Sequence, residues 1–421
     1  MDKGTNIPQG YKDSPLGVIP EDWEVKRLED ISFIKGGYAF NSTTFKPQGK
    51  FQVIKMSNLY EGDLNLKRSE SFIDELRDVE KEFLLKPNDI LITLTGTIGK
   101  RDYGYTFQIS DQQNLLLNQR VAKIHATKSD DKYLYFFTKT LCFLNSFYLS
   151  SRGGTGNQSN VSTIDLGRIK ILYPPLPEQQ KIAEILSCWD EAIEKQTRLI
   201  KKLETRKHGL MQQLLTGKKR LKGFEGEWKI FHYNDVIKEV QRRLQWNETE
   251  LYELISVKRR SGGLFLREPL YGHQIKTKKL RPAFDGDFLI SKMQIVHGAS
   301  GLTTKEFHEK KISDSYIAVI SKDKDILNIE YFNWISKMPY FYHQTYISSY
   351  GVHIEKMTFD FETFMSLRVR LPSIQEQTAI ANILSSANEE TQKEKEKLSA
   401  LNSQKKGLMQ QLLIGNTRVK I

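Results

Sequence analysis

Residues Pro174 to Gly217 read PPLPEQQKIAEILSCWDEAIEKQTRLIKKLETRKHGLMQQLLTG, and this stretch decides the architecture of the chain. Its apolar residues recur at alternating spacings of four and three, which is the pattern of a coiled-coil helix. Prolines are tolerated before a helix and in its first turn, and Gly217 suits a helix end. We therefore predict a helical rod roughly 50 Å long. The seam of this rod is predicted to consist of Ile182, Leu186, Trp189, Ile193, Ile200, Leu203, Leu210 and Leu214.

The same pattern returns 198 residues later, from Leu371 to Gly415. The segment GLMQQLL at Gly209–Leu215 reappears unchanged at Gly407–Leu413. A tandem duplication explains this repeat, so the order along the chain is domain, rod, domain, rod. The second seam is more polar than the first. It is predicted to consist of Ile380, Leu384, Leu398, Leu401, Leu408 and Leu412.

Landmarks before the two rods repeat at the same offset. A turn feeding a buried strand occurs at Lys86–Thr93 and at Phe284–Ser291, and aromatic-rich helical stretches occur at Tyr133–Tyr148 and Tyr331–Tyr346. Two like units in one chain tend to pack about an approximate two-fold axis, which makes the rods antiparallel. The sequence thus predicts an α+β fold in which two similar domains alternate with two long helices that pair as an antiparallel coiled coil. The predicted boundaries are 1–173, 174–222, 223–370 and 371–421.

The chain is basic, with a net charge of +12 and a pI of about 9.3, which favours an acidic partner such as nucleic acid. The positive charge is spread over both domains and both rods, so simple solubility remains an alternative. Two cysteines are too few for a cysteine-rich metal site. Both of them, Cys142 and Cys188, are predicted to be buried thiols. The polar arm at residues 1–16 lacks a signal core, and no stretch reaches membrane-spanning length. We expect a cytoplasmic protein without a membrane partner.

No motif supports an active site in this chain. Leu172–Leu176 lacks the Asn or Asp that a DNA amino-methyltransferase motif needs, and no glycine-rich cofactor loop is present. Gly96–Lys100 resembles a phosphate loop, but its glycines are too close together and Arg101 follows the lysine. The eight histidines are scattered. We predict no catalytic residue, no metal and no cofactor in this chain.

Polar and basic side chains on glycine-containing loops are suited to contact DNA. The first domain has two such loops, Thr95–Arg101 and Ser151–Asn160. In the second domain, Lys258–Arg260 is the densest positive run outside the rods and is predicted to bind phosphate. Ordinary surface loops are the alternative interpretation. The candidate residues are Thr95, Thr97, Lys100, Arg101, Arg152, Asn157, Gln158, Lys258, Arg259, Arg260, Lys276, Lys278, Lys279, His297, Ser300, Tyr350 and His353.

The repeated rod, with PPLPEQQKIA at Pro174–Ala183 and two copies of GLMQQLL, resembles the specificity subunit of type I restriction-modification enzymes. The resemblance covers essentially the whole chain. It implies two target recognition domains that each read half of a split DNA site. It also implies two methyltransferase subunits on the rods, with restriction subunits joining that core. S-adenosylmethionine is expected in the methyltransferase partner, which must flip the base that it methylates. The chain departs from the pattern at Gln375, which stands where the first rod has Pro177.

Two other functions remain open at this point. The chain could be a protein-binding coiled-coil adaptor whose basic patches are incidental, and salt-dependent binding to one DNA sequence would exclude that. It could also be a self-contained restriction-methylation enzyme, which methylation by the purified chain alone would reveal. If the rods set the distance between two recognition domains, half-site centres about 34 Å apart are expected, which is one turn of DNA.

Overall fold

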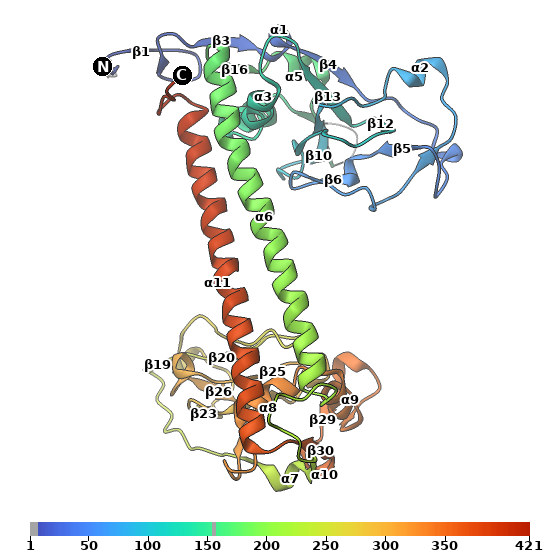
Figure 1. Cartoon of the computed structure of the whole chain (residues 1–421). Coiled ribbons are helices and arrows are strands. Elements are labelled where there is room, and N and C mark those ends of the chain that lie inside the picture. The colour runs from blue at the N-terminus through green and yellow to red at the C-terminus, as the bar shows by residue number, and fades with distance from the viewer. Residues whose placement is uncertain (1–6, 154–156) are drawn as a thin grey trace. The chain divides into compact units, whose positions relative to one another are not determined.

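The computed structural model describes residues 7–153 and 157–421 (Figure 1). These residues form two compact units. Unit 1 contains Met1–Thr197 together with Lys397–Ile421, and unit 2 contains Arg198–Glu396. The boundaries fall inside the two long helices, α6 (Leu176–Leu214) and α11 (Ile374–Leu412). Each unit therefore combines one domain with the first turns of one rod and the last turns of the other.

Unit 1 is built on a four-stranded antiparallel sheet in the order β11-β9-β13-β4. Its strands are β4 (Ser32–Gly36), β9 (Ile90–Thr93), β11 (Thr106–Gln108) and β13 (Val121–Ala126). A second sheet, in which β12 and β5 run parallel, consists of β5 (Phe51–Ile54), β8 (Phe72–Ile73) and β12 (Leu115–Leu117). The aromatic stretch forms α3 (Asp131–Phe137) and α4 (Leu141–Leu149), and β3 (Glu24–Arg27) pairs with β16 (Lys170–Tyr173). The other elements are β1 (Tyr11–Lys12), β2 (Ile19–Pro20), α1 (Leu28–Ile31), η1 (Ser42–Thr44), η2 (Met56–Asn58), β6 (Leu59–Tyr60), β7 (Asp63–Leu64), α2 (Asp78–Lys81) and α5 (Thr163–Gly167).

Unit 2 repeats this scaffold. Its main sheet has the equivalent order β18-β27-β24-β25, with β18 (Ile237–Glu239), β24 (Phe288–Ser291), β25 (Ser300–Leu302) and β27 (Tyr316–Ser321). Helices α8 (Ile329–Ile335) and α9 (Pro339–Ile347) correspond to α3 and α4, and β17 (Lys229–His232) pairs with β30 (Arg368–Leu371). The intervening hairpins differ from those of unit 1. They comprise β19 (Leu251–Tyr252), β20 (Ile255–Val257), β21 (Leu264–Leu266), β22 (Leu270–Tyr271), β23 (Leu280–Pro282), β26 (Lys311–Ser313), β28 (Ser349–Tyr350) and β29 (Thr358–Phe359), with α7 (Tyr233–Val236) and α10 (Phe361–Ser366).

The two rods pack against each other in an antiparallel manner within each unit. In unit 1 the start of α6 lies beside the end of α11 (Figure 1), and Ile182, Leu186 and Leu412 belong to one core. In unit 2 the end of α6 packs against the start of α11 through Leu214, Ile380 and Leu384. Because burial of an apolar stripe stabilises a helix more than propensity does, the domains and rods stabilise each other. The predicted fold class is confirmed.

All the predicted seam residues are buried or half-buried. Ile182, Leu186, Ile200, Leu203, Leu214, Ile380, Leu384 and Leu412 are buried, and Trp189, Ile193, Leu210, Leu398, Leu401 and Leu408 are half-buried. Both rods end at a glycine whose backbone lies in the left-handed region, Gly217 with φ of 70° and Gly415 with φ of 79°. Any residue with a Cβ atom would be strained in that conformation.

Two expectations need correction or restriction. The prediction of two buried thiols is wrong, because Cys188 is exposed on the side of α6 away from its seam and Cys142 is half-buried. Of the predicted loops, residues 1–6 of the arm and residues 154–156 lie outside the described residues. Within the described ranges, no helix has the length and apolarity needed to cross a bilayer.

Candidate nucleic-acid interface

The two candidate loops of the first domain meet in one small sheet. Strand β10 (Thr95–Thr97) pairs with β15 (Gln158–Asn160), and β15 pairs with β14 (Arg152–Gly153). Thr97 stands opposite Gln158, and the Ile98 backbone N–H donates to the Asn157 carbonyl at 3.2 Å. Residues about 60 positions apart are thus held on one sheet, which gives their side chains a fixed relative position.

Not every candidate in these loops is available to a ligand. Thr95 is buried and its hydroxyl donates to Asn160 Oδ1 at 2.9 Å, and its contact with DNA stays a prediction. Thr97 donates to Asp102 from both its backbone N–H and its hydroxyl, each at 2.8 Å. The backbone hydrogen bond is the main reason that the pKa of the Asp102 carboxyl is lowered. These two threonines therefore stabilise the loop.

Several exposed side chains of this sheet and its loops are basic or amide-bearing. Lys100, Asn157 and Gln158 are exposed. Arg101 donates to Asn145 Oδ1 at 3.1 Å and stacks over the Tyr148 ring, 5.0 Å from its centroid. Arg152, with its side chain 78% exposed, contacts Asp165 at 3.2 Å. Such groups can bind phosphate and base edges.

In the second domain, the segment His297–Gly298 and helix α9 both contact the loop Lys258–Gly263 between β20 and β21. The backbone N–H of Arg260 donates to the carbonyl of His297 at 2.6 Å, and that of Ser261 donates to Gly298 at 2.9 Å. The Ser261 hydroxyl also hydrogen-bonds the Tyr342 hydroxyl at 2.7 Å. Arg260 and Ser261 have φ of 58° and 52°, in the left-handed region that is costly for side-chain-bearing residues. Strained backbone that is held this firmly is typical of binding sites.

The side chains of this loop reach solvent. Lys258, Arg259 and Arg260 are all exposed, and the Lys258 ammonium lies 5.4 Å from the centroid of the Phe265 ring. Arg259 contacts Glu355 at 3.1 Å. Tyr350 is 65% exposed.

The remaining candidates of this domain fall into two groups. His353 is exposed, and His297 is half-buried and lies 3.6 Å from Glu355. Ser300 is buried in β25, and its contact with DNA stays a prediction. A second basic segment carries Lys276, Lys278 and Lys279, all exposed, at the edge of the small core around Tyr252 and Leu280. Lys278 is paired with Glu248 at 2.5 Å.

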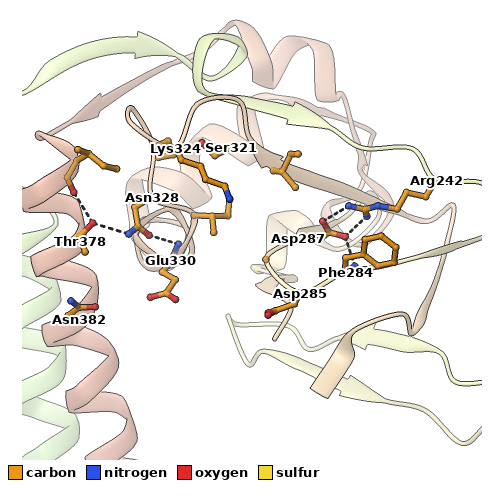
Figure 2. A pocket seen from close by; sticks show the side chains of 15 residues that line it. Arg242, Phe284, Asp285, Asp287, Ser321, Lys324, Asn328, Glu330, Thr378 and Asn382 are labelled. Carbon is orange, nitrogen blue, oxygen red and sulfur yellow. Dashed lines mark hydrogen bonds and ion pairs between the residues drawn. The ribbon is translucent and has the colours of Figure 1, made fainter. Parts of the chain in front are cut away.

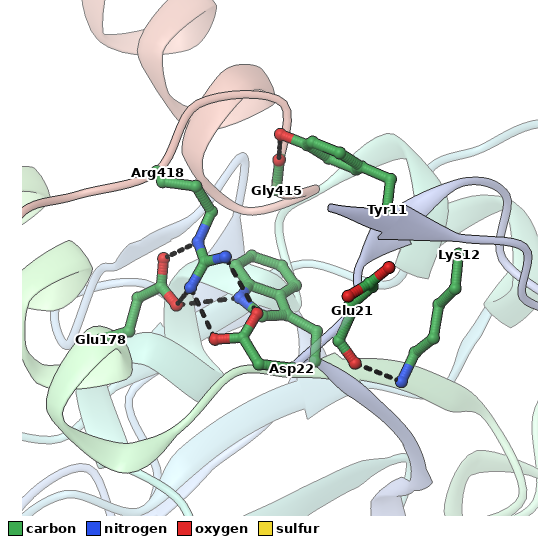
Figure 3. Close-up of polar contacts among 8 residues, drawn as sticks. Tyr11, Lys12, Glu21, Asp22, Glu178, Gly415 and Arg418 are labelled. Atoms are coloured by element: carbon green, nitrogen blue, oxygen red, sulfur yellow. Dashed lines mark hydrogen bonds and ion pairs between the residues drawn. The ribbon is translucent and has the colours of Figure 1, made fainter. Parts of the chain in front are cut away.

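The sequence did not predict the pair that the Arg418 guanidinium forms with a buried carboxylate in unit 1 (Figure 3). Glu178, at the start of α6, is fully buried and accepts from Arg418 at 2.7 and 2.9 Å and from the Trp23 indole N–H at 2.9 Å. Arg418 also donates twice to Asp22, at 2.9 and 2.7 Å. The hydrogen bonds to Glu178 are the largest cause of the raised pKa of Arg418. These hydrogen bonds connect the first domain to the start of α6 and to the segment that follows α11.

The same pair recurs in unit 2, at positions shifted by 198. Buried Glu376 accepts from Arg220 at 2.6 and 2.7 Å. The sequence analysis does not predict this pair, although the spacing of both pairs matches the repeat. That spacing is the signal that could have revealed them.

The family model for the type I restriction modification DNA specificity domain matches residues 20–205 and again residues 225–403. The chain belongs to this family. It is 23% identical over 435 residues to a putative type I restriction enzyme MjaX specificity subunit of Methanocaldococcus jannaschii, covering 98% of this chain and 97% of that relative. It is 30% identical over 224 residues to the MjaVIII specificity subunit of the same organism, which is 52% of each. The crystal structure of the S subunit of a type I system from M. genitalium has the same fold, with a TM-score of 0.60 at 14% identity over 98% of both chains.

The two family matches coincide with the two repeats. The chain is thus a non-catalytic specificity subunit with two DNA target recognition domains, rather than a coiled-coil adaptor or a self-contained enzyme. DNA and the other subunits of a type I complex are its partners. Among the described residues, no three His, Cys, Asp or Glu side chains are grouped as metal ligands.

A hollow of about 650 Å³ in the specificity subunit lies beside the first turns of α11 (Figure 2). Asn328 donates to Thr378 at 3.1 Å on one side, and buried Asp287 accepts twice from Arg242, at 2.5 and 2.9 Å, on the other. Unit 1 has a hollow of about 430 Å³ at the equivalent place. There Lys132 stands at the position of Glu330, so the two hollows do not share one ligand chemistry.

Proposed function

We propose that domains 1–173 and 223–370 each read one half of a split DNA target, and that the rods 174–222 and 371–421 hold two methyltransferase subunits. The observation that carries this proposal is the repeated four-stranded sheet bearing unlike basic loops. Two domains that share a scaffold but carry different loops are suited to recognise two different DNA sequences. The complex would act on cytoplasmic DNA, with S-adenosylmethionine bound by the methyltransferase subunits and restriction subunits joining that core.

We assign different side chains to two tasks, which are positioning the protein on the DNA backbone and reading the bases. Lys258, Arg259 and Arg260 would bind phosphate, since point charges on an exposed loop neutralise the DNA backbone without regard to sequence. In the first domain, Arg152 and the amides of Asn157 and Gln158 would reach base edges, because arginine suits guanine and amides suit adenine.

Domain exchange tests the assignment. Residues 225–370 are replaced by the recognition domain of another specificity subunit, and methylated sites are mapped with the partner present. One half-site should change and the other should remain. A change in both half-sites would contradict independent reading.

The rods would set the spacing of the two half-sites. One added heptad in each rod lengthens it by about 10 Å, which corresponds to about three base pairs. The unread spacer should therefore grow while both half-sites stay the same. Altered half-sites with an unchanged spacer would refute this role of the rods.

A further inference from the structure

Glu355 is a carboxylate placed among the phosphate-binding candidates of the second domain. It lies in η6 (Ile354–Lys356), on the connection from β28 to β29. Its carboxylate is 3.1 Å from the Arg259 guanidinium and 3.6 Å from His297 Nε2. The side chains of Arg259 and Glu355 are 51% and 59% exposed, so a DNA strand can reach both.

The loop backbone does not depend on this ion pair. Arg260 and Ser261 donate to the carbonyls of His297 and Gly298, and the Ser261 hydroxyl bonds Tyr342. Loss of the Glu355 charge would therefore release the Arg259 side chain without releasing the loop.

A carboxylate and a phosphate offer arginine the same chemistry, namely paired anionic oxygens. An exposed ion pair contributes about 0–1 kcal/mol, so phosphate can displace Glu355 from Arg259. We propose that Glu355 is an internal competitor for DNA phosphate at Arg259, which limits the sequence-independent affinity of the second recognition domain. This inference rests on the proposed DNA-reading role of that domain.

The first domain contains a comparable pair. Exposed Arg152 contacts Asp165, whose side chain is only 13% exposed and also accepts from Ser162 at 2.7 Å. In both domains an arginine on a candidate DNA loop is thus held by a carboxylate of the same domain.

A double-mutant cycle tests the inference, using the full chain with its methyltransferase partner. Affinity for non-target duplex DNA is measured for the wild type, Glu355→Gln, Arg259→Ala and the double variant over a range of salt concentrations. Glu355→Gln should tighten non-target binding by about three- to fivefold, which is the effect of an exposed pair. It should also steepen the slope of log affinity against log salt concentration, by up to the equivalent of about one more neutralised phosphate. In the Arg259→Ala background, the Glu355 substitution should have no further effect.

Glu330→Gln is the matched control, because it removes one exposed carboxylate at the start of α8, where the side chain lines the hollow beside α11. It should leave non-target affinity unchanged. The inference is overturned if Glu355→Gln still tightens binding without Arg259, if Glu330→Gln has an equal effect, or if Glu355→Gln changes the preferred bases. Thermal melts verify that each variant is folded. If the wild-type complex shows no preference for any DNA sequence, the proposed function fails and not this inference alone.

Discussion

Replacing Arg418 with methionine should destabilise unit 1 by about 2–3 kcal/mol. Glu178 is fully buried and accepts two of its three described hydrogen bonds from Arg418. Removing one partner of a buried pair costs about 3–5 kcal/mol, because the other charge is left uncompensated. The Arg418 side chain is 38% exposed, so water replaces part of its interaction and the expected cost is reduced to about 2–3 kcal/mol.

Urea denaturation followed by circular dichroism measures this loss. The double variant Arg418→Met/Glu178→Gln is the decisive comparison. Glutamine keeps an acceptor for the Trp23 indole and removes the charge, so the double variant should recover about 1–2 kcal/mol relative to Arg418→Met. Arg220→Met provides the equivalent perturbation in unit 2. A loss below about 0.5 kcal/mol for Arg418→Met, or a double variant no more stable than the single, would refute the reasoning.

Three further predictions follow from particular side chains and from the repeat. Alanine at each position of Lys258–Arg260 should weaken binding to all DNA sequences and flatten its salt dependence; a changed half-site with an unchanged salt slope would show base reading instead. Burial lowers the pKa of Lys337 to about 8, with Lys207 adding to the shift. Because the unfolded chain then binds more protons between about pH 8 and 10.5, the free energy of unfolding should rise across that window in urea titrations, and Lys337→Met should abolish the rise. A fragment of residues 1–222 should form a two-fold dimer in sedimentation, with Arg220 of one copy pairing with Glu178 of the other, and with its partner should methylate an interrupted palindrome; a monomer would contradict this.

The rods and the duplication were readable from the sequence because they depend on periodicity. The spacing of four and three runs along each copy, and helix α6 falls within the predicted segment. The repeated offset also located one strand of each main sheet, since β9 and β24 are largely apolar runs.

The arginine–carboxylate pairs recur at the offset of the repeat but have no local pattern that marks them, and the loop sheet has no periodic signal. Glu178 sits in the first turn of a helix, where a carboxylate is favourable even when exposed, so nothing local reveals its burial. Strands β10 and β15 are three residues long, too short to show alternation. Residue type indicated which loops could contact DNA, but only tertiary packing decided that Thr95 and Ser300 face inward.

The division of the chain into units has a consequence for synthesis on the ribosome. Unit 2, Arg198–Glu396, is continuous, so all its residues are available before translation ends. Unit 1 needs Lys397–Ile421, including Arg418, which is 396 residues from its partner Asp22. Until Lys397–Ile421 has been synthesised, the apolar stripe of α6 beside the first domain therefore stays uncovered. Such exposed apolar surface is prone to aggregation. A frameshift before the codons of Lys397–Ile421 would consequently damage the first recognition domain, although that domain is encoded far upstream.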